Sequence, residues 1–175
     1  KTFKECAEAY MDAHSSDYTS DKHRKQWPAT LFTYAYPIIG NMLVSDIVMR
    51  DVRNVLEQET VVDINTKGKL WYVKTETAKR LLGRIKTVLD YATVNDYRSG
   101  TNPAQWTGYL STQLPSPKNL QKKEHHPAVP YQQMGDFISK LRTNPSLSAK
   151  ALEFLILTAV RSGSVRQAEW TEIDL

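Results

Sequence analysis

The segment from Leu155 to Leu175 contains the side chain with the most specific chemistry in this chain. An apolar run ends at Arg161, and a Ser-Gly pair and a polar stretch follow it. An arginine at the end of an apolar helix is costly to place unless its guanidinium meets an anion. The planar guanidinium can bind a phosphate through two parallel hydrogen bonds, which suits this task better than the ammonium group of lysine. The segment therefore predicts a phosphate-binding arginine at position 161.

A second candidate is a group of basic residues on the longest predicted helix. It consists of Lys74, Lys79, Arg80, Arg84 and Lys86, with Glu76 as the only acid among them. At 100° per residue, Lys79 and Lys86 share one side of the helix and Arg80 and Arg84 share another, while the apolar stripe faces away from both. Such a surface can follow a duplex backbone, and each phosphate contact releases counterions and makes binding salt-dependent. For an arbitrary helix, a solvated charged face is the favoured explanation of the same pattern.

A third candidate lies at the start of an earlier helix and consists of Lys22, Arg24 and Lys25. Positive charge gains nothing there, because the helix dipole favours anions at its N-terminus. Phosphate binding would explain this placement. A solubilising cluster ahead of Trp27 explains it equally well.

The Arg161 segment resembles the motif around the first catalytic arginine of tyrosine recombinases, most closely that of phage and genomic-island integrases. The matching residues are Leu157, Thr158, Arg161, Ser162, Gly163, Trp170, Glu172, Ile173 and Asp174. One departure is Ser164, where the family usually has glutamate. The resemblance implies that a tyrosine attacks a DNA phosphodiester and forms a 3′-phosphotyrosyl link without a metal or other cofactor. It also implies that Arg161 stabilises the charge of the transition state.

The resemblance extends to the helical core-binding domain that precedes the catalytic domain in such integrases. The matching residues are Trp27, Pro37, Ile39, Gly40, Val44, Ile47, Ala78, Arg80, Ile85, Val88, Tyr91, Ala92, Asn102, Pro103 and the segment His125–Ala128. It implies an all-α architecture with a SAM-like core-binding bundle at residues 1–112. The bundle is followed by a basic, proline-containing linker at 113–127. The first helices of a truncated catalytic domain follow at 128–175.

The remaining catalytic groups of this family lie downstream of the first arginine, and no tyrosine follows Arg161 in this chain. We therefore expect a DNA-binding fragment that cannot complete strand exchange and is monomeric, whereas the full-length protein works as a tetramer on DNA. The implied partner is the double-stranded core of an attachment site, in the cytoplasm and at the nucleoid of a bacterial cell.

The overall composition fits a folded protein with a nucleic-acid partner. Hydrophobic residues make up 41% of the chain and charged residues 24%, and the net charge is +4. These values are those of a globular protein, and the basic excess is moderate. The single cysteine, Cys6, excludes an internal disulfide, and no apolar run approaches the ~20 residues of a membrane span.

Helical periodicity predicts the elements that position these residues. The expected helices cover residues 2–14, 19–36, 48–56, 71–97, 131–141 and 148–161. A capping box at Thr2 and Glu5 begins the first helix, Pro28 should kink the second, and the segment Tyr36–Gly40 should end it. The polar connection 60–68 is expected to contain no strand.

Two alternatives stay open on the sequence alone. A non-catalytic helical DNA-binding protein would share the basic helix faces, but it gives no reason for the Arg161 motif. A helical protein-interaction module would bind DNA weakly and without sequence preference. The adjacent His125 and His126 lack neighbouring carboxylates or cysteines in a ligand pattern, so no metal site is expected.

Overall fold

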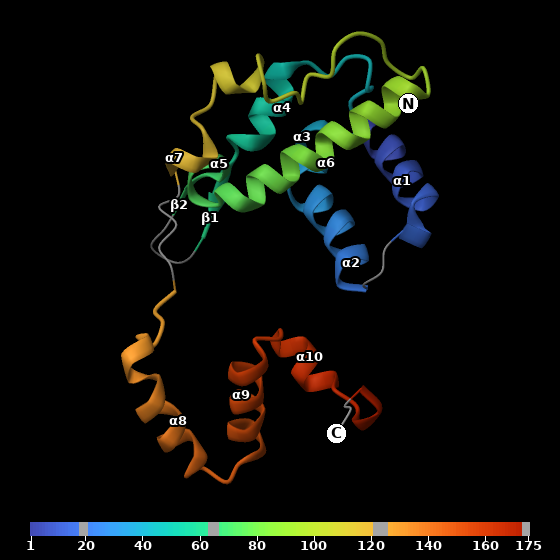
Figure 1. The fold of residues 1–175 in the computed structure, drawn as a ribbon. Helices are drawn as coiled ribbons and strands as arrows, with labels where there is room; N and C mark the ends of the chain where they lie inside the picture. The colour runs from blue at the N-terminus through green and yellow to red at the C-terminus, as the bar shows by residue number, and fades with distance from the viewer. Residues whose placement is uncertain (18–20, 63–66, 121–125, 173–175) are drawn as a thin grey trace. The chain divides into compact units, whose positions relative to one another are not determined.

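The computed structural model describes residues 1–17, 21–62, 67–120 and 126–172, and for residues 17 and 21–24 it describes the backbone alone. The chain forms two compact units, Lys1–Lys123 and Glu124–Leu175. Helices dominate both units, and the strands found among the described residues form one two-stranded sheet (Figure 1). The predicted all-α fold class is therefore confirmed.

The first helix, α1 (Phe3–Ala13), begins with the predicted capping box. The backbone N–H of Thr2 donates to the Glu5 carboxylate at 2.7 Å, and the N–H of Glu5 donates to the Thr2 hydroxyl at 3.3 Å. Phe3, Cys6 and Ala7 form its buried side. These bonds satisfy two of the four N–H groups that a helix start leaves unpaired, so they fix where α1 begins.

Replacing Thr2 with alanine is expected to lower the free energy of unfolding by about 1 kcal/mol, the usual contribution of a capping side chain. Hydrogen bonds from the Thr2 backbone and side chain also lower the pKa of the Glu5 carboxyl. Because this pKa is lower in the folded chain, the stabilisation is present above the ordinary glutamate pKa and is lost as the pH falls through the folded-state value. Urea unfolding at neutral and acidic pH would measure both effects. A stability difference between wild type and Glu5→Gln that does not shrink at acidic pH would contradict this assignment.

The second helix, α2 (Asp21–Thr30), continues past Pro28 and then widens into a π-helical turn, Leu31–Ala35. The chain stays helical through α3 (Tyr36–Ile39), and the helix ends at the last residue of the predicted segment Tyr36–Gly40. Pro37 lies in the first turn of α3, where its missing N–H costs little. At Gly40, where the helix ends, a Cβ atom would lie only 2.5 Å from the carbonyl oxygen of Tyr36.

The helix α4 (Met49–Leu56) buries Val52, Val55 and Leu56 against the core. Two short strands follow, β1 (Glu59–Val61) and β2 (Lys67–Lys69), which pair antiparallel with Thr60 opposite Gly68. The expectation of a strand-free connection at 60–68 was therefore wrong. Only three residues pair on each side, too few for alternation of apolar and polar residues to reveal a strand in the sequence.

The predicted helix 71–97 is in fact two helices, α5 (Leu70–Val73) and α6 (Thr75–Val94). The break falls at Lys74, whose backbone leaves the helical region (φ −129°, ψ 52°). There the Thr75 hydroxyl donates to the Trp71 carbonyl at 2.9 Å, so this buried acceptor keeps a partner where the helix is interrupted.

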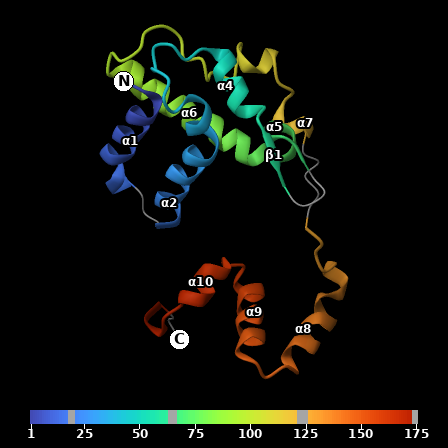
Figure 2. The ribbon, with the colours of Figure 1, turned by 180° about the vertical axis from the view of Figure 1, so that it is seen from behind.

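The helix α6 is the central element of the first unit and contacts α1, α4, α5 and the π-helical turn (Figures 1 and 2). Its predicted apolar stripe is buried. The buried residues of α6 are Thr75, Ala78, Leu81, Leu82, Ile85, Val88, Leu89 and Ala92. The basic residues of α6 therefore occupy the remaining sides of a helix whose orientation the core fixes.

The segment after α6 folds back onto the first unit. Asn102 donates from its side-chain amide to the Lys86 carbonyl at 2.9 Å and to the Asp90 carboxylate at 2.7 Å. The Trp106 ring stacks on Trp71, with ring centroids 5.4 Å apart. A short helix, α7 (Pro117–Leu120), follows, so part of the predicted linker 113–127 packs with this unit.

The second unit contains α8 (Met134–Arg142), α9 (Leu147–Thr158) and α10 (Ser162–Gln167). An ion pair between Arg142 and Glu153, with Nε and Oε1 2.7 Å apart, joins α8 to α9. Among the described residues of this unit, Ala149 is the only hydrophobic residue that is buried. The exposed large apolar side chains are Val129, Tyr131, Leu147, Leu152, Phe154, Leu157, Val160 and Trp170. This unit thus lacks a closed core of its own over residues 126–172.

Across the described ranges, none of the helices is long and apolar enough to cross a membrane.

Candidate nucleic-acid interface

The basic side chains predicted on the long helix differ in how free they are to bind an external anion. Lys79 and Arg80 are exposed on α6, and no ion pair of either is found within the described ranges. Lys74 lies at the break before α6, where its ammonium group donates to the Val61 carbonyl of β1 at 2.8 Å. Lys79 and Arg80 are therefore the most available cations of this group.

Lys86 has an intramolecular partner. Its ammonium group lies 2.6 Å from a carboxylate oxygen of Asp90, one turn further along α6, and each side chain is about half exposed. Partial burial by itself would raise the pKa of the Asp90 carboxyl, but hydrogen bonds from Lys86 and Asn102 outweigh it and lower this pKa. Asp90 thus stays charged and reduces the positive potential around Lys86.

Arg84 connects α6 to α2. Its guanidinium donates to the Gln26 carbonyl at 2.7 Å and lies 5.5 Å from the centroid of the Trp27 ring. A half-buried guanidinium with a carbonyl partner and an aromatic face stabilises the packing of the two helices. Removing Arg84 would therefore disturb the fold as well as the surface charge.

The basic cluster near the start of α2 is described only in part. Lys25 is exposed, while the side chains of Lys22 and Arg24 lie outside the described residues. The backbone at all three positions is helical. Arg84 of α6 donates to the carbonyl of Gln26, which lies on α2. The cluster is therefore on a helix that contacts the side of α6 carrying Arg80 and Arg84.

The prediction that Arg161 lies at the end of the preceding helix was wrong. The helix α9 ends at Thr158, and Ala159 adopts a left-handed conformation (φ 53°) that costs a non-glycine residue roughly 1 kcal/mol. Arg161 is extended (φ −73°, ψ 148°) and precedes α10, and its carbonyl accepts hydrogen bonds from Ser164 and Val165. Ser162 and Gly163 begin α10 rather than ending α9.

In this position, Arg161 is not stabilised by a helix dipole. A cation is favoured by the dipole at the C-terminal end of a helix, but Arg161 stands before the N-terminal end of one. Its side chain is exposed, and no hydrogen bond or ion pair of its guanidinium is found over residues 126–172. The exposed arginine is free to bind an anion outside this unit.

The other residues of the predicted Arg161 motif are spread over three elements. Thr158 closes α9 with a 2.6 Å hydrogen bond from its hydroxyl to the Phe154 carbonyl. Trp170 lies in a short 3₁₀ turn and is 82% exposed. Ile173 and Asp174 lie outside the described residues, as does His125. The described part of the chain also holds no group of three His, Cys, Asp or Glu side chains placed to bind a metal ion.

Known proteins resemble this chain in sequence and in fold. A profile of the phage integrase central domain matches residues 3–109, which is more than half of the chain. The chain therefore belongs to the phage integrase family, and the resemblance to phage integrases drawn from its residues is confirmed.

Two curated relatives are integrases. The integrase of Enterobacteria phage P4 is 29% identical over 157 residues, covering 89% of this chain and 32% of that protein. The prophage integrase IntZ of Escherichia coli K12 is 24% identical over 174 residues, covering 99% of this chain and 38% of that protein. The chain thus spans about a third of the length of these relatives.

A solved structure shares the fold. The solution NMR structure of protein Nmul_A0922 from Nitrosospira multiformis matches with a TM-score of 0.52 and 40% sequence identity. The match covers 73% of this chain and the whole of that structure.

Proposed function

We propose that this chain is part of a site-specific recombinase and that its first unit binds the double-stranded core of an attachment site. The observation that carries the proposal is the pair Lys79 and Arg80, exposed on α6 without an ion-pair partner within the described ranges. Membership of the phage integrase family supports it. Lys25, Lys74, Arg84 and Lys86 extend this basic surface, and Lys74, Arg84 and Lys86 also have intramolecular partners. Lys22 and Arg24, whose side chains lie outside the described residues, belong to the proposed DNA-binding set as well.

In this proposal, Arg161 serves the chemistry of strand cleavage. Its guanidinium contacts the non-bridging oxygens of the scissile phosphate and stabilises the charge that develops as a tyrosine hydroxyl displaces the 5′ oxygen. The product is a 3′-phosphotyrosyl link with a free 5′ hydroxyl. Because this link stores the energy of the broken phosphodiester, we expect the reaction to need no metal or high-energy cofactor. No tyrosine follows Arg161 in the printed sequence, and we expect these 175 residues to bind DNA without cleaving it.

The surface of the second unit fits this role. Its exposed apolar residues, such as Phe154 and Leu157, would pack against further parts of a catalytic domain. We propose that the 175-residue chain is monomeric, that the complete recombinase acts as a tetramer on DNA, and that it works in the bacterial cytoplasm at the nucleoid.

The DNA-binding proposal predicts that Lys79→Ala together with Arg80→Ala weakens duplex binding strongly. If each side chain contacts one phosphate, the slope of log K against log salt falls by about 2. Fluorescence anisotropy of a labelled duplex across a salt series would measure both quantities. Arg84 is left intact because its contacts with Gln26 and Trp27 stabilise the fold.

The matched control removes the same charge elsewhere in the first unit, with Lys4→Ala and Lys67→Ala. Both side chains are exposed and lie outside α6. The control should keep most of the affinity. Equal effects of the two double variants would indicate unspecific attraction to a basic protein, and no effect of either would favour the protein-interaction alternative.

A further inference from the structure

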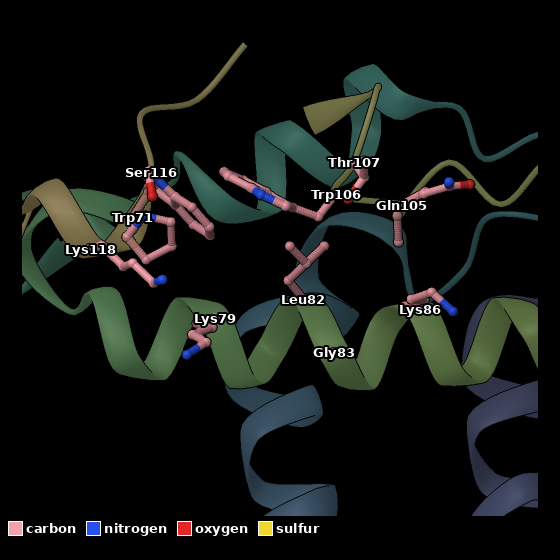
Figure 3. Close-up of a pocket in the computed structure, with 12 residues that line it drawn as sticks. Trp71, Lys79, Leu82, Gly83, Lys86, Gln105, Trp106, Thr107, Ser116 and Lys118 are labelled. Carbon is pink, nitrogen blue, oxygen red and sulfur yellow. The ribbon is translucent and has the colours of Figure 1, made fainter. Parts of the chain in front are cut away.

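The pocket beside α6 shares Lys79 and Lys86 with the proposed duplex-binding surface, but a duplex does not fill its apolar interior. It has a volume of about 710 Å³ and lies along the side of α6 that carries Lys79 and Lys86 (Figure 3). Residues 104–107 and 116–118 form its opposite wall. This volume is within the range of pockets that enclose a small ligand.

The middle of the pocket is apolar and aromatic. Trp106 is half buried and lies opposite Leu82 of α6, with Trp71 beside it (Figure 3). The stacking of Trp106 on Trp71 fixes the plane of the indole before any ligand arrives. A rigid aromatic surface of this kind binds a planar ring with little loss of entropy.

The two ends of the pocket carry cationic and polar donors. Lys79 and Lys118 lie at the end near Trp71, and Lys86 and Gln105 lie at the other end (Figure 3). No carboxylate is among the residues that line it, and of its three lysines Lys86 has an ion pair within the described ranges. The pocket therefore attracts a ligand with negative charge on both sides of a planar group.

We infer that this pocket binds an unpaired nucleotide of a DNA strand. The base lies against Trp106 and Leu82, and the phosphates on either side of that nucleotide lie at the two cationic ends. A paired base in a duplex cannot enter, because its flat faces are covered by its neighbours. The inference rests on the proposed action of this chain on DNA and adds a site for a single strand. An acidic peptide would satisfy the lysines but would not need the aromatic middle of the pocket.

The test compares two exposed cations that lie on different sides of the first unit. Lys118→Glu changes the pocket and Arg80→Glu changes the other basic side of α6. Each variant of the 175-residue chain is titrated into a labelled oligothymidylate and into a labelled random-sequence duplex. We expect Lys118→Glu to weaken oligothymidylate binding several-fold with little effect on the duplex, and Arg80→Glu to weaken duplex binding more.

A third variant probes the aromatic surface. Trp106→Leu should weaken oligothymidylate binding by roughly tenfold, the loss expected for one stacked base. Because Trp106 also packs against the core, circular dichroism must first show that this variant is folded. If Trp106→Leu does not fold, Lys118→Glu still tests the inference.

The outcomes separate the inference from the proposed function. Wild-type chain that binds the duplex but not oligothymidylate overturns the pocket inference alone, and so does an equal effect of Lys118→Glu on both DNAs. Displacement of oligothymidylate by a random glutamate–tyrosine copolymer at a lower concentration than by unlabelled oligothymidylate would overturn it in favour of a protein partner. Binding to neither DNA overturns the proposed function as well.

Discussion

Replacing Arg161 with alanine is expected to lower the rate of DNA-strand cleavage by a factor on the order of 10²–10³ in a complete recombinase that contains this chain. The physical reason is that the guanidinium stabilises the additional negative charge that develops on the phosphate oxygens in the transition state, so its removal affects the reaction more than binding. The exposed position of Arg161 before α10, without an ion pair within residues 126–172, is compatible with this role. Single-turnover cleavage of a nicked attachment-site duplex would measure the rate, and anisotropy would measure the binding.

The controls for this prediction use the same segment. Arg161→Lys keeps the charge but loses the two-pronged hydrogen bonding, so it should restore only part of the rate. Ser164→Glu restores the residue usual in the family and places a carboxylate in the first turn of α10, where the helix dipole favours it. We expect this variant to preserve or raise cleavage. A clear loss of cleavage in Ser164→Glu, or a normal rate in Arg161→Ala, would show that the family pattern does not transfer to this segment.

Replacing Arg98 with methionine is expected to reduce the free energy of unfolding of the first unit by about 3 kcal/mol, because buried acceptors lose their donor. Arg98 is 8% exposed and donates to the carbonyls of Val44 and Thr101 and to the hydroxyl of Thr93. It thereby joins the end of α6 to the loop before α4. Methionine fills similar space but removes the donor of these oxygens, among which the hydrogen bond to the Val44 carbonyl is the buried one.

Urea unfolding followed by tryptophan fluorescence would measure this loss. Arg80→Met is the matched control, since Arg80 is exposed and its replacement should change stability by less than about 0.5 kcal/mol. Arg98→Lys should recover only part of the loss, because one ammonium group cannot reach all the acceptors that the guanidinium spans. Equal stabilities of Arg98→Met and Arg80→Met would show that the buried hydrogen bonds contribute little.

The features that the sequence predicted correctly are those set by residues close together in the chain. Thr2 and Glu5 specify the start of α1 through bonds between positions three apart. The spacing of Leu81, Ile85 and Val88 specifies the buried side of α6, because side chains three and four apart share one side of a helix. The family motifs are also local, and they were sufficient to predict an all-α phage integrase.

The tertiary structure alone decided which of the predicted cations have partners. Arg80 and Arg84 lie on the same side of α6 and look equivalent in the sequence, yet Arg84 binds Gln26 of α2. Lys86 is paired with Asp90, which Asn102 also binds from the segment beyond α6. These contacts join residues up to 58 positions apart, and helical periodicity carries no information about such pairs.

The break at Lys74 and the position of Arg161 both depart from the helical periodicity of the sequence. Periodicity favours a continuous helix across Lys74, but the Thr75 hydroxyl takes up the Trp71 carbonyl and Lys74 binds Val61 of the neighbouring strand, so the chain turns there. At Arg161, apolar residues on both sides of α9 suggest one helix up to the arginine. The left-handed Ala159 ends that helix earlier and places Arg161 before α10. The sequence thus determined which residues are apolar, basic and helical, whereas the folded chain decided where these helices stop and which charges have partners, because both depend on backbone conformations and contacts that helical periodicity does not encode.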